Sequence, residues 1–255
     1  MRSINYIDKI ACICITDNRV ELLPRAIQCF RDQDYEEKEL LIFYDASDAH
    51  TASFARNKTD VNLVKLDGSS FKNSICLKSN ESNITFIEID HYSKFSLGEK
   101  RNLATEYAEA DFICVWDDDD WYSPRRLSQQ ILACQHAGKP ACALSSLTIY
   151  DSIHHKAYYS IKRHEGWEGS LLCRKEYMEK YLPQNTKEDT PVLKRLFADG
   201  YLVLIDFPHL YTYIIHGKNI SGTQHLNSVV AASTSISDEE CEGIKYVLEE
   251  SIVFR

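Results

Sequence analysis

The chain has 255 residues, of which 44% are hydrophobic and 26% are charged, as in an ordinary soluble globular protein. This length is sufficient for one large α/β domain or two small ones with a sizeable core. The net charge of −9 argues against general nucleic-acid binding, which needs a basic surface, so a bound nucleotide diphosphate would require local Lys, Arg or a metal ion.

Nine cysteines are present, and five of them lie in apolar, strand-like runs where a free Cys behaves as a small buried hydrophobe. The odd count, the lack of a Cys-x-x-Cys pair and the lack of an apolar signal core in residues 1–9 predict a cytoplasmic protein without a disulfide framework or a zinc site. We expect no transmembrane segment, because no apolar run is long enough to cross a bilayer. The five cysteines are Cys12, Cys14, Cys114, Cys142 and Cys173.

The first half of the chain alternates strand-like and helix-like segments. This βαβ pattern predicts parallel strands joined by right-handed crossovers. A polar stretch at 67–83 predicts a surface hairpin or excursion. The expected strands are 10–16, 39–44, 61–66, 84–89 and 112–116, and the expected helices are 22–32, 98–110 and 124–137.

The pattern changes after residue 140, where antiparallel strands are expected around a polar turn. One domain is favoured over two, with a parallel first half and a mixed second half. The last expected helix, 238–250, turns Ile244, Val247 and Leu248 inward. The expected strands are 141–150, 157–162, 170–173, 201–205 and 210–216, and the expected helices are 175–181, 191–199 and 238–250.

Four consecutive carboxylates, Asp117 to Asp120, follow the apolar strand 112–116. Such a concentration of like charge is unfavourable unless cations compensate it. Oxygen ligands suit Mg²⁺ or Mn²⁺, which commonly bridge to phosphates. The alternative is a solvated acidic turn that caps the next helix. We favour metal binding for Asp117 and Asp119, whereas Asp120 could serve only as a cap.

Polar groups also follow two other expected strands, at Thr16-Asp17-Asn18-Arg19 and at Asp45-Ala46-Ser47. Ligands of open α/β sheets bind beyond the carboxyl ends of the strands, so these groups predict one polar pocket together with the acidic run. No Gly-x-Gly-x-x-Gly and no P-loop sequence is present, which argues against a dinucleotide dehydrogenase or a P-loop enzyme.

Lys100 and Arg101 begin a helix, where they could bind an anion or form a solvated face. The Glu188-Asp189 pair before Pro191 is equally consistent with a helix cap and with a general base. A lone His such as His216 is more often structural than a metal ligand, although Gly217 would place it at a strand end. Trp167, between two glycines, could face a sugar ring or simply pack.

The order of these motifs resembles that of family 2 glycosyltransferases with the GT-A fold, over about residues 9–219. The resemblance rests on six segments: Cys14-Ile15-Thr16-Asp17-Asn18-Arg19 with the following Leu-Leu-Pro-Arg-Ala-Ile, Glu39 to Ser47, Gly98 to Ala104, Asp117-Asp118-Asp119 with Trp121 to Leu127, Glu188-Asp189, and His216-Gly217-x-Asn219.

The resemblance implies a metal-dependent, inverting transfer of a sugar from a nucleoside diphosphate sugar, with UDP favoured, to a hydroxyl of a glycan or other acceptor. It divides the single domain into a donor-binding half (1–138), an acceptor-binding half (139–226) and a helical tail (227–255). Any contact with a membrane would come through the acceptor. It implies Mn²⁺ or Mg²⁺ bound by Asp117, Asp119 and His216; donor contacts from Thr16, Asn18, Arg19, Asp45, Lys100, Arg101 and Asp118; Asp189 as the base; and weaker acceptor contacts from Trp167 and Glu188.

Two positions depart from the family pattern. Asp17 stands where an aromatic residue is usual, and Tyr44 stands where a second acid is usual. These departures bear on the choice of nucleobase. Two other functions remain open: a nucleotidyltransferase, which uses a similar acidic metal cluster but reacts at the α-phosphorus, and a sugar-nucleotide binding module without turnover.

Overall fold

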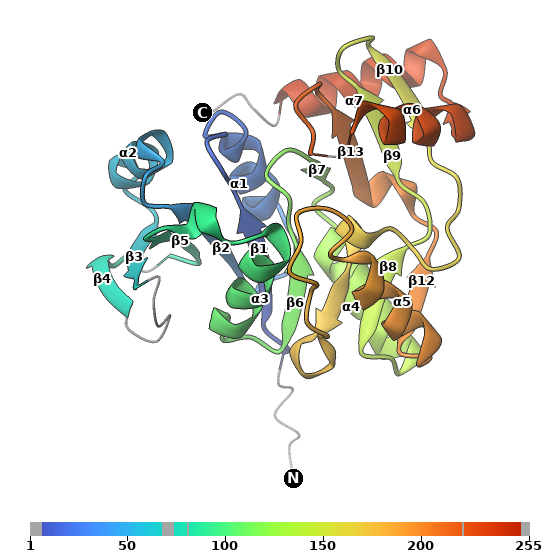
Figure 1. The fold of residues 1–255 in the computed structure, drawn as a ribbon. Coiled ribbons are helices and arrows are strands. Elements are labelled where there is room, and N and C mark those ends of the chain that lie inside the picture. The colour runs from blue at the N-terminus through green and yellow to red at the C-terminus, as the bar shows by residue number, and fades with distance from the viewer. Residues whose placement is uncertain (1–6, 68–73, 81, 221, 251–255) are drawn as a thin grey trace.

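The computed structural model describes residues 7–67, 74–80, 82–220 and 222–250, which fold around two sheets (Figure 1). The larger sheet has nine strands. In spatial order they are β12 (Leu202–Ile205), β8 (Ala141–Leu144), β11 (Leu172–Arg174), β6 (Phe112–Val115), β1 (Ile10–Ile15), β2 (Lys38–Asp45), β5 (Ile84–Ile89), β3 (Asn62–Leu66) and β4 (Ser74–Lys78).

The centre of this sheet is parallel, as the βαβ pattern predicts. Strand β1 pairs in parallel with β2 on one side and with β6 on the other. Its residues are apolar on both faces and almost all are buried, which is typical of a sheet covered on both sides. Strands β4 and β11 run antiparallel to their neighbours. From β1 the chain continues to β2 on one side and later to β6 on the other, so the strand order reverses between β1 and β6. Such a reversal places a crevice at the carboxyl ends of the two strands.

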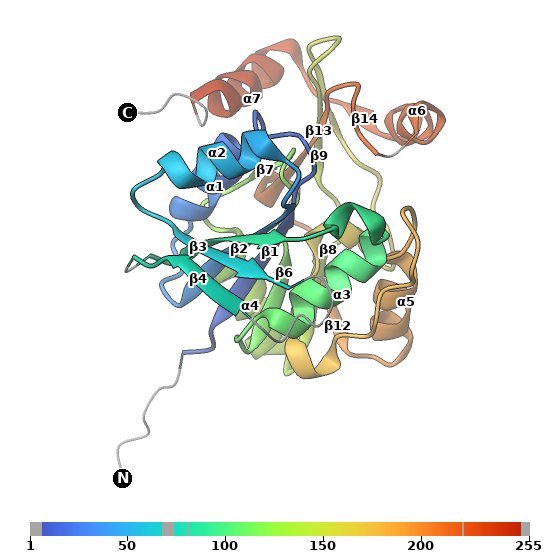
Figure 2. The same ribbon diagram turned by 60° about the vertical axis from the view of Figure 1, so that its left-hand side comes forward.

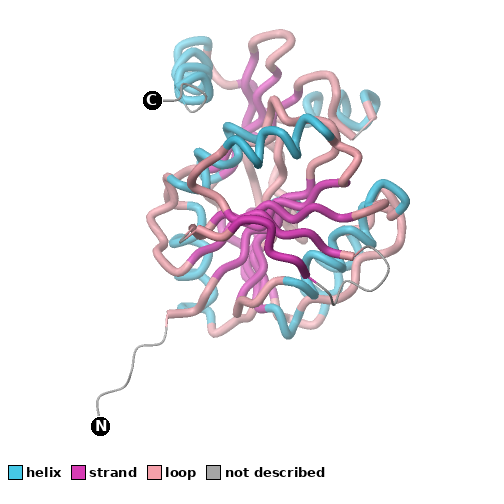
Figure 3. Tube along the Cα trace, turned by 90° about the vertical axis from the view of Figure 1, so that its left-hand side faces the viewer, coloured by secondary structure: helices cyan, strands magenta, loops and turns pink. Residues whose placement is uncertain are grey.

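Helices cover both faces of the larger sheet, and Figure 3 shows the strands at the centre of the molecule. In α1, Leu23, Ile27 and Phe30 form the buried stripe that the sequence predicts, with a Pro in the first turn. Figure 2 shows α1 and α2 above the strands and α3 below them. On one face lie α1 (Leu23–Arg31), α2 (Ala49–Asn57) and α4 (Arg126–Ala137), and on the other α3 (Leu97–Tyr107) and α5 (Thr190–Ala198).

The smaller sheet has five strands and lies beside α6 (Thr223–Ala232) and α7 (Asp238–Glu250) (Figure 1). The chain passes from the larger to the smaller sheet after β6, after β8 and after β12. The acidic run occupies the first of these crossings, between β6 and β7. In spatial order the five strands are β14 (Thr234–Ser235), β10 (Lys156–Tyr159), β9 (Thr148–Asp151), β13 (Tyr211–Ile215) and β7 (Trp121–Tyr122).

Several expected elements differ from those observed. The apolar run 141–150 is two strands, β8 and β9, which belong to different sheets. The helix expected at 175–181 is only a 3₁₀ turn, Lys175–Tyr177. Helices α2 and α6 were not expected, and Val247 on α7 is 44% exposed rather than inward. Within the expected excursion, β4 pairs with β3 as a hairpin, while residues 68–73 and 81 lie outside the described part.

The five cysteines in strand-like runs are buried in β1, β6, β8 and β11, as expected for small apolar side chains. Across the described ranges, every helix is too short or too polar to span a membrane.

Candidate active site

The acidic run is buried rather than solvated. Asp118, Asp119 and Asp120 are 1%, 8% and 0% exposed, and the side chain of Asp117 is 33% exposed. The interpretation of this run as a solvated helix cap is therefore wrong. Helix α4 begins only at Arg126, with Arg125 at its N-cap. Buried carboxylates require compensation from nearby donors or cations, and each of the four has a partner from another part of the chain.

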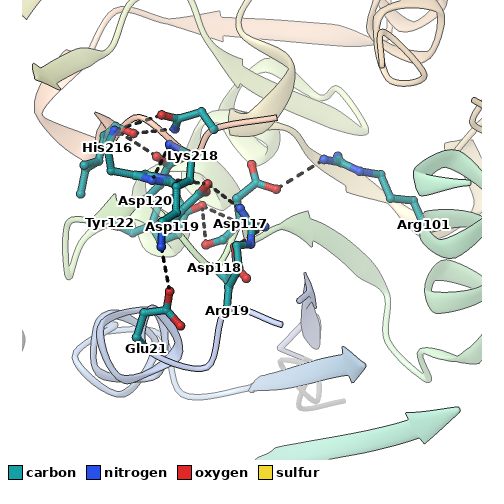
Figure 4. Close-up of polar contacts among 12 residues, drawn as sticks. Arg19, Glu21, Arg101, Asp117, Asp118, Asp119, Asp120, Tyr122, His216 and Lys218 are labelled. Carbon is teal, nitrogen blue, oxygen red and sulfur yellow. Dashed lines mark hydrogen bonds and ion pairs between the residues drawn. The ribbon is translucent and has the colours of Figure 1, made fainter. Parts of the chain in front are cut away.

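Arg19 compensates two of these carboxylates (Figure 4). Its Nη2 atom lies 2.7 Å from Asp118 Oδ1, and its Nη1 atom lies 3.0 Å from Asp119 Oδ2. Burial and the nearby Asp119 raise the pKa of Asp118 above its usual range, although Arg19 opposes this effect. Arg19 follows β1 and the acidic run follows β6, so the ion pairs cross the point where the strand order reverses.

His216 contacts Asp119 from the other sheet. Its Nε2 atom lies 3.1 Å from Asp119 Oδ2, and the backbone N–H of Lys218 donates to its Nδ1 atom. The turn after β13 depends on Gly217, whose φ of 80° favours glycine, and on the Asn219 side chain, which contacts the backbone of His216 and Ile214. Burial raises the pKa of Asp119, but His216 and Arg19 outweigh burial and hold it below its usual range.

Asp120 ties the acidic run to β13. Its carboxylate accepts hydrogen bonds from the Tyr211 hydroxyl and from the Ile214 backbone N–H. Burial raises the pKa of Asp120 well above its usual range. Because Ile214 lies two residues before His216, this attachment fixes the position of Asp119 relative to His216. This role of Asp120 is not evident from the sequence, because its partners lie more than ninety residues away.

A buried arginine supports the same crossing. The guanidinium of Arg126 is stacked against Trp116, Tyr122 and Tyr211 and donates to the carbonyl oxygens of Val115 and Gly169. Arg126 is completely buried, and its role was not predicted from the sequence. Trp116 and Tyr122, shortly before it in the sequence, were a signal, since cations often stack on aromatic rings.

Lys100 and Arg101 do not form a solvated face. Helix α3 begins with a capping box between Ser96 and Glu99, and the next two residues turn toward the acidic groups. Lys100 Nζ lies 3.7 Å from Asp17, and Arg101 lies 3.4 Å from Asp117 and 3.3 Å from Glu188. Figure 4 shows Arg101 reaching toward Asp117 from α3.

Gly98 allows α3 to approach the segment that carries Glu188. A Cβ atom at this position would lie 1.7 Å from the backbone oxygen of Leu182, so no larger residue fits without a shift of the backbone. Gly98 N–H also donates to the Gln184 carbonyl oxygen. These contacts hold Arg101 and Glu188 side by side.

Asp189 occupies the N-cap position of α5, but its side chain makes no capping hydrogen bond within the described part of the chain. Capping therefore does not explain this carboxylate. Burial raises the pKa of Asp189 above its usual range, although Arg101 opposes the shift. Burial likewise raises the pKa of the adjacent Glu188. A carboxylate with a raised pKa beside a cavity is suited to accept a proton.

Asp45, at the end of β2, and Asn18, after β1, are not part of the cavity lining. Asp45 accepts hydrogen bonds from the Ser47 hydroxyl and from the backbone N–H groups of Ser47 and Ser93. Burial raises its pKa, but these hydrogen bonds prevail and lower it to about 2. The Asn18 backbone N–H donates to Asp48, a buried residue that the sequence analysis did not single out.

A cavity of about 1340 Å³ joins most of these groups. It lies at the carboxyl ends of β1 and β6 and extends to α5 and α6. Thr16, Asn18, Asp45, Asp118 and His216 lie behind or beside its lining. Of the residues predicted from sequence, the lining includes Arg19, Lys100, Arg101, Asp117, Asp119, Trp167, Glu188 and Asp189.

Trp167 lines this cavity, but one of its faces is covered. The guanidinium carbon of Arg163 lies 3.4 Å from the centre of a Trp167 ring, and the indole packs against the core. A sugar ring could not stack on the face that Arg163 covers.

The expected metal ligands are only partly assembled. In the ranges that the structure describes, no three His, Cys, Asp or Glu side chains converge on one point as a metal cluster. Asp119 and His216 lie together and offer the oxygen and nitrogen donors that Mn²⁺ accepts, whereas Asp117 faces Arg101. Two protein donors are compatible with a metal ion that also binds phosphate oxygens.

Comparison with known proteins identifies the family. The sequence model of glycosyl transferase family 2 matches residues 12–193, which is more than half of the chain. The chain belongs to glycosyl transferase family 2. No curated protein sequence matches this family member.

Solved structures with the same fold are distant in sequence. The structure of S. aureus TarS 1–349 has 13% identity and a TM-score of 0.58, over 81% of this chain and 60% of that one. TarS 1–349 with UDP-GlcNAc has 12% identity and a TM-score of 0.60, over 95% and 66%. The mannosyltransferase PcManGT of Pyrobaculum calidifontis, solved with GDP-Man and Mn²⁺, has 12% identity and a TM-score of 0.59, over 97% and 70%. These likenesses show the GT-A fold.

Removal of the Tyr211 hydroxyl should destabilise the protein. Tyr211→Phe leaves one oxygen of the buried Asp120 without its donor, which costs about 1–3 kcal/mol of unfolding free energy. Urea denaturation would measure the loss, with Tyr159→Phe at an exposed position as the control. An equal effect of the two substitutions would contradict the structural role of Asp120.

Proposed function

We propose that this protein transfers a sugar from a nucleoside diphosphate sugar to a hydroxyl group of a glycan or other acceptor, with inversion at the anomeric carbon and with the help of Mn²⁺ or Mg²⁺. The observation that carries the proposal is one cavity lined by Asp119, by Lys100 and Arg101, and by Asp189, in a member of glycosyl transferase family 2. Anion-binding, metal-binding and proton-accepting groups thus share one space.

The donor is proposed to lie over the carboxyl ends of β1 and β6, with UDP as the favoured nucleotide. One TarS structure contains UDP and another contains UDP-GlcNAc, whereas the PcManGT structure contains GDP-Man. The likeness to TarS therefore supports UDP, and the likeness to PcManGT supports GDP. Thr16, Asn18 and Asp45 would shape the nucleoside site through the backbone that they hold. Asp118 would lie near the ribose, behind the cavity lining, and Lys100, Arg101 and Arg19 would face the diphosphate.

A metal ion would be held by Asp119 and His216, with Asp117 assisting from the side of Arg101. When bound, it would stabilise the negative charge that develops on the leaving diphosphate. The cationic groups of Lys100 and Arg101 would act on the same charge. Their burial beside the cavity strengthens this effect, because a less polar surrounding screens charge less than water does.

Asp189 is proposed to remove the proton from the acceptor hydroxyl as the oxygen attacks the anomeric carbon. The attack comes from the face opposite the diphosphate, so a single displacement inverts the configuration and needs no covalent intermediate. Glu188, paired with Arg101, would fix the position of this base. A base whose pKa is raised by burial transfers protons more readily near neutral pH.

Residues 1–138 are proposed as the donor half, 139–226 as the acceptor half and 227–255 as a tail of helices. Trp167 would meet the acceptor at its edge.

Nucleotide binding tests the proposed donor. Isothermal titration with UDP, GDP, CDP and dTDP in the presence of Mn²⁺ should show binding of UDP, and Asp119→Ala should weaken it because the metal loses a ligand. Asp60→Ala, at an exposed residue remote from the cavity, is the control. Absence of binding to all four nucleotides would overturn the proposal.

The role of Asp189 is tested by its amide. Asp189→Asn should reduce the transfer rate by about 10²–10⁴-fold, because the amide cannot accept the proton. It should leave the unfolding free energy nearly unchanged, since the Asp189 carboxylate accepts no capping hydrogen bond from α5 in the described part of the chain. Asp199→Asn, at the other end of α5, is the matched control.

The pH dependence gives a second readout of the same variant. A base acts only when deprotonated, so kcat/KM of the wild type should fall as the pH decreases toward the pKa of Asp189, above the ordinary value of 3.8. This acidic limb should disappear in Asp189→Asn. A variant that keeps both the rate and the limb would show that the base is elsewhere, with Glu188 the first candidate.

A further inference from the structure

Arg19 occupies the side of Asp119 that a bound metal ion would also approach. It pairs with both Asp118 and Asp119 through separate guanidinium nitrogens, at 2.7 and 3.0 Å. Its side chain is only 18% exposed, yet it lines the cavity, whereas Asp118 lies behind the lining. The two carboxylates therefore already have a cation supplied by the chain itself.

Arg19 and a metal ion would compete for one atom, Asp119 Oδ2. Arg19 Nη1 and His216 Nε2 both lie within hydrogen-bond distance of this one oxygen. A metal ion that binds Asp119 and His216 must approach between the same groups, where it meets the positive charge of Arg19. Charges at such separations interact strongly in partly buried surroundings, so Arg19 opposes metal binding as long as it stays.

Arg19 is also suited to bind the donor. A guanidinium matches the oxygens of phosphate as well as those of carboxylate and can contact two at once. Two other cations of the cavity are engaged differently, since Lys100 faces Asp17 and Arg101 faces Asp117 and Glu188. Arg19 is thus the cation that shares Asp119 Oδ2 with His216, the second residue of the proposed metal site.

We propose that Arg19 is the resident counterion of Asp118 and Asp119 and that, when a metal ion binds Asp119, its guanidinium turns from Asp119 to the donor diphosphate while it remains beside the buried Asp118. This inference rests on the proposed function. The exchange makes tight metal binding depend on the nucleotide. Because coupling between two ligands is reciprocal, the metal ion increases nucleotide affinity by the same factor.

Mn²⁺ binding measured by electron paramagnetic resonance tests this exchange, with and without UDP. Arg19→Gln should bind Mn²⁺ alone about tenfold more tightly than the wild type, because the competing charge is gone. The factor by which UDP increases Mn²⁺ affinity should fall by about tenfold. Arg56→Gln, which removes an exposed cation paired with Glu88, should change neither quantity.

A second variant keeps the test decisive if Arg19→Gln does not fold. Arg19→Lys retains the charge but cannot make bidentate contacts. Mn²⁺ alone should therefore bind as weakly as to the wild type, while the factor by which UDP increases Mn²⁺ affinity should decrease. Circular dichroism would establish that each variant is folded. Unchanged or weaker Mn²⁺ affinity in folded Arg19→Gln, or an undiminished effect of UDP in Arg19→Lys, would overturn the inference.

The two proposals fail in different ways. If the wild type binds neither UDP nor Mn²⁺ in the presence of UDP, the proposed function itself is wrong. If the wild type binds both and the Arg19 variants do not differ from it, only the exchange is wrong.

Discussion

The structure depends on the burial of consecutive carboxylates at the crossing between the two sheets. Three of the four are at most 8% exposed, and a buried charge without a partner would cost several kcal/mol. Their partners come from separate parts of the chain: Arg19 after β1, Arg101 on α3, Tyr211 on β13 and His216 after it. Compensation of this charge therefore also fixes the elements that surround the cavity.

This arrangement couples the fold to the proposed chemistry. Asp120 is satisfied entirely by β13, which leaves Asp119 to face His216 and Arg19. Arg101 connects the acidic run to Glu188, next to Asp189, so the proposed metal and base lie on two sides of one ion-pair chain. The same carboxylates that need cations for stability are thus available to a metal ion and to the cations of the donor site.

The sequence predicted the parallel strands and the strand-end position of the acidic run, because both follow from local hydrophobic pattern and family motifs. It could not predict the partners of Asp118, Asp119 and Asp120, which lie about a hundred residues away. Nor could it divide the apolar run 141–150, since Ser145 and Ser146 give little signal for a change of sheet. The motifs before α5 suggested a cap and a base equally, and the structure bears only on the cap, because the Asp189 side chain makes no capping hydrogen bond in the described part of the chain.

The most direct test of this account is a crystal of the protein with Mn²⁺ and UDP, examined by the anomalous scattering of manganese. The account predicts a manganese peak in contact with Asp119, His216 and the diphosphate of UDP, with Arg19 turned from Asp119 toward the phosphates. Bound UDP with no manganese peak at Asp119, or a manganese peak remote from the acidic run Asp117 to Asp120, would contradict it.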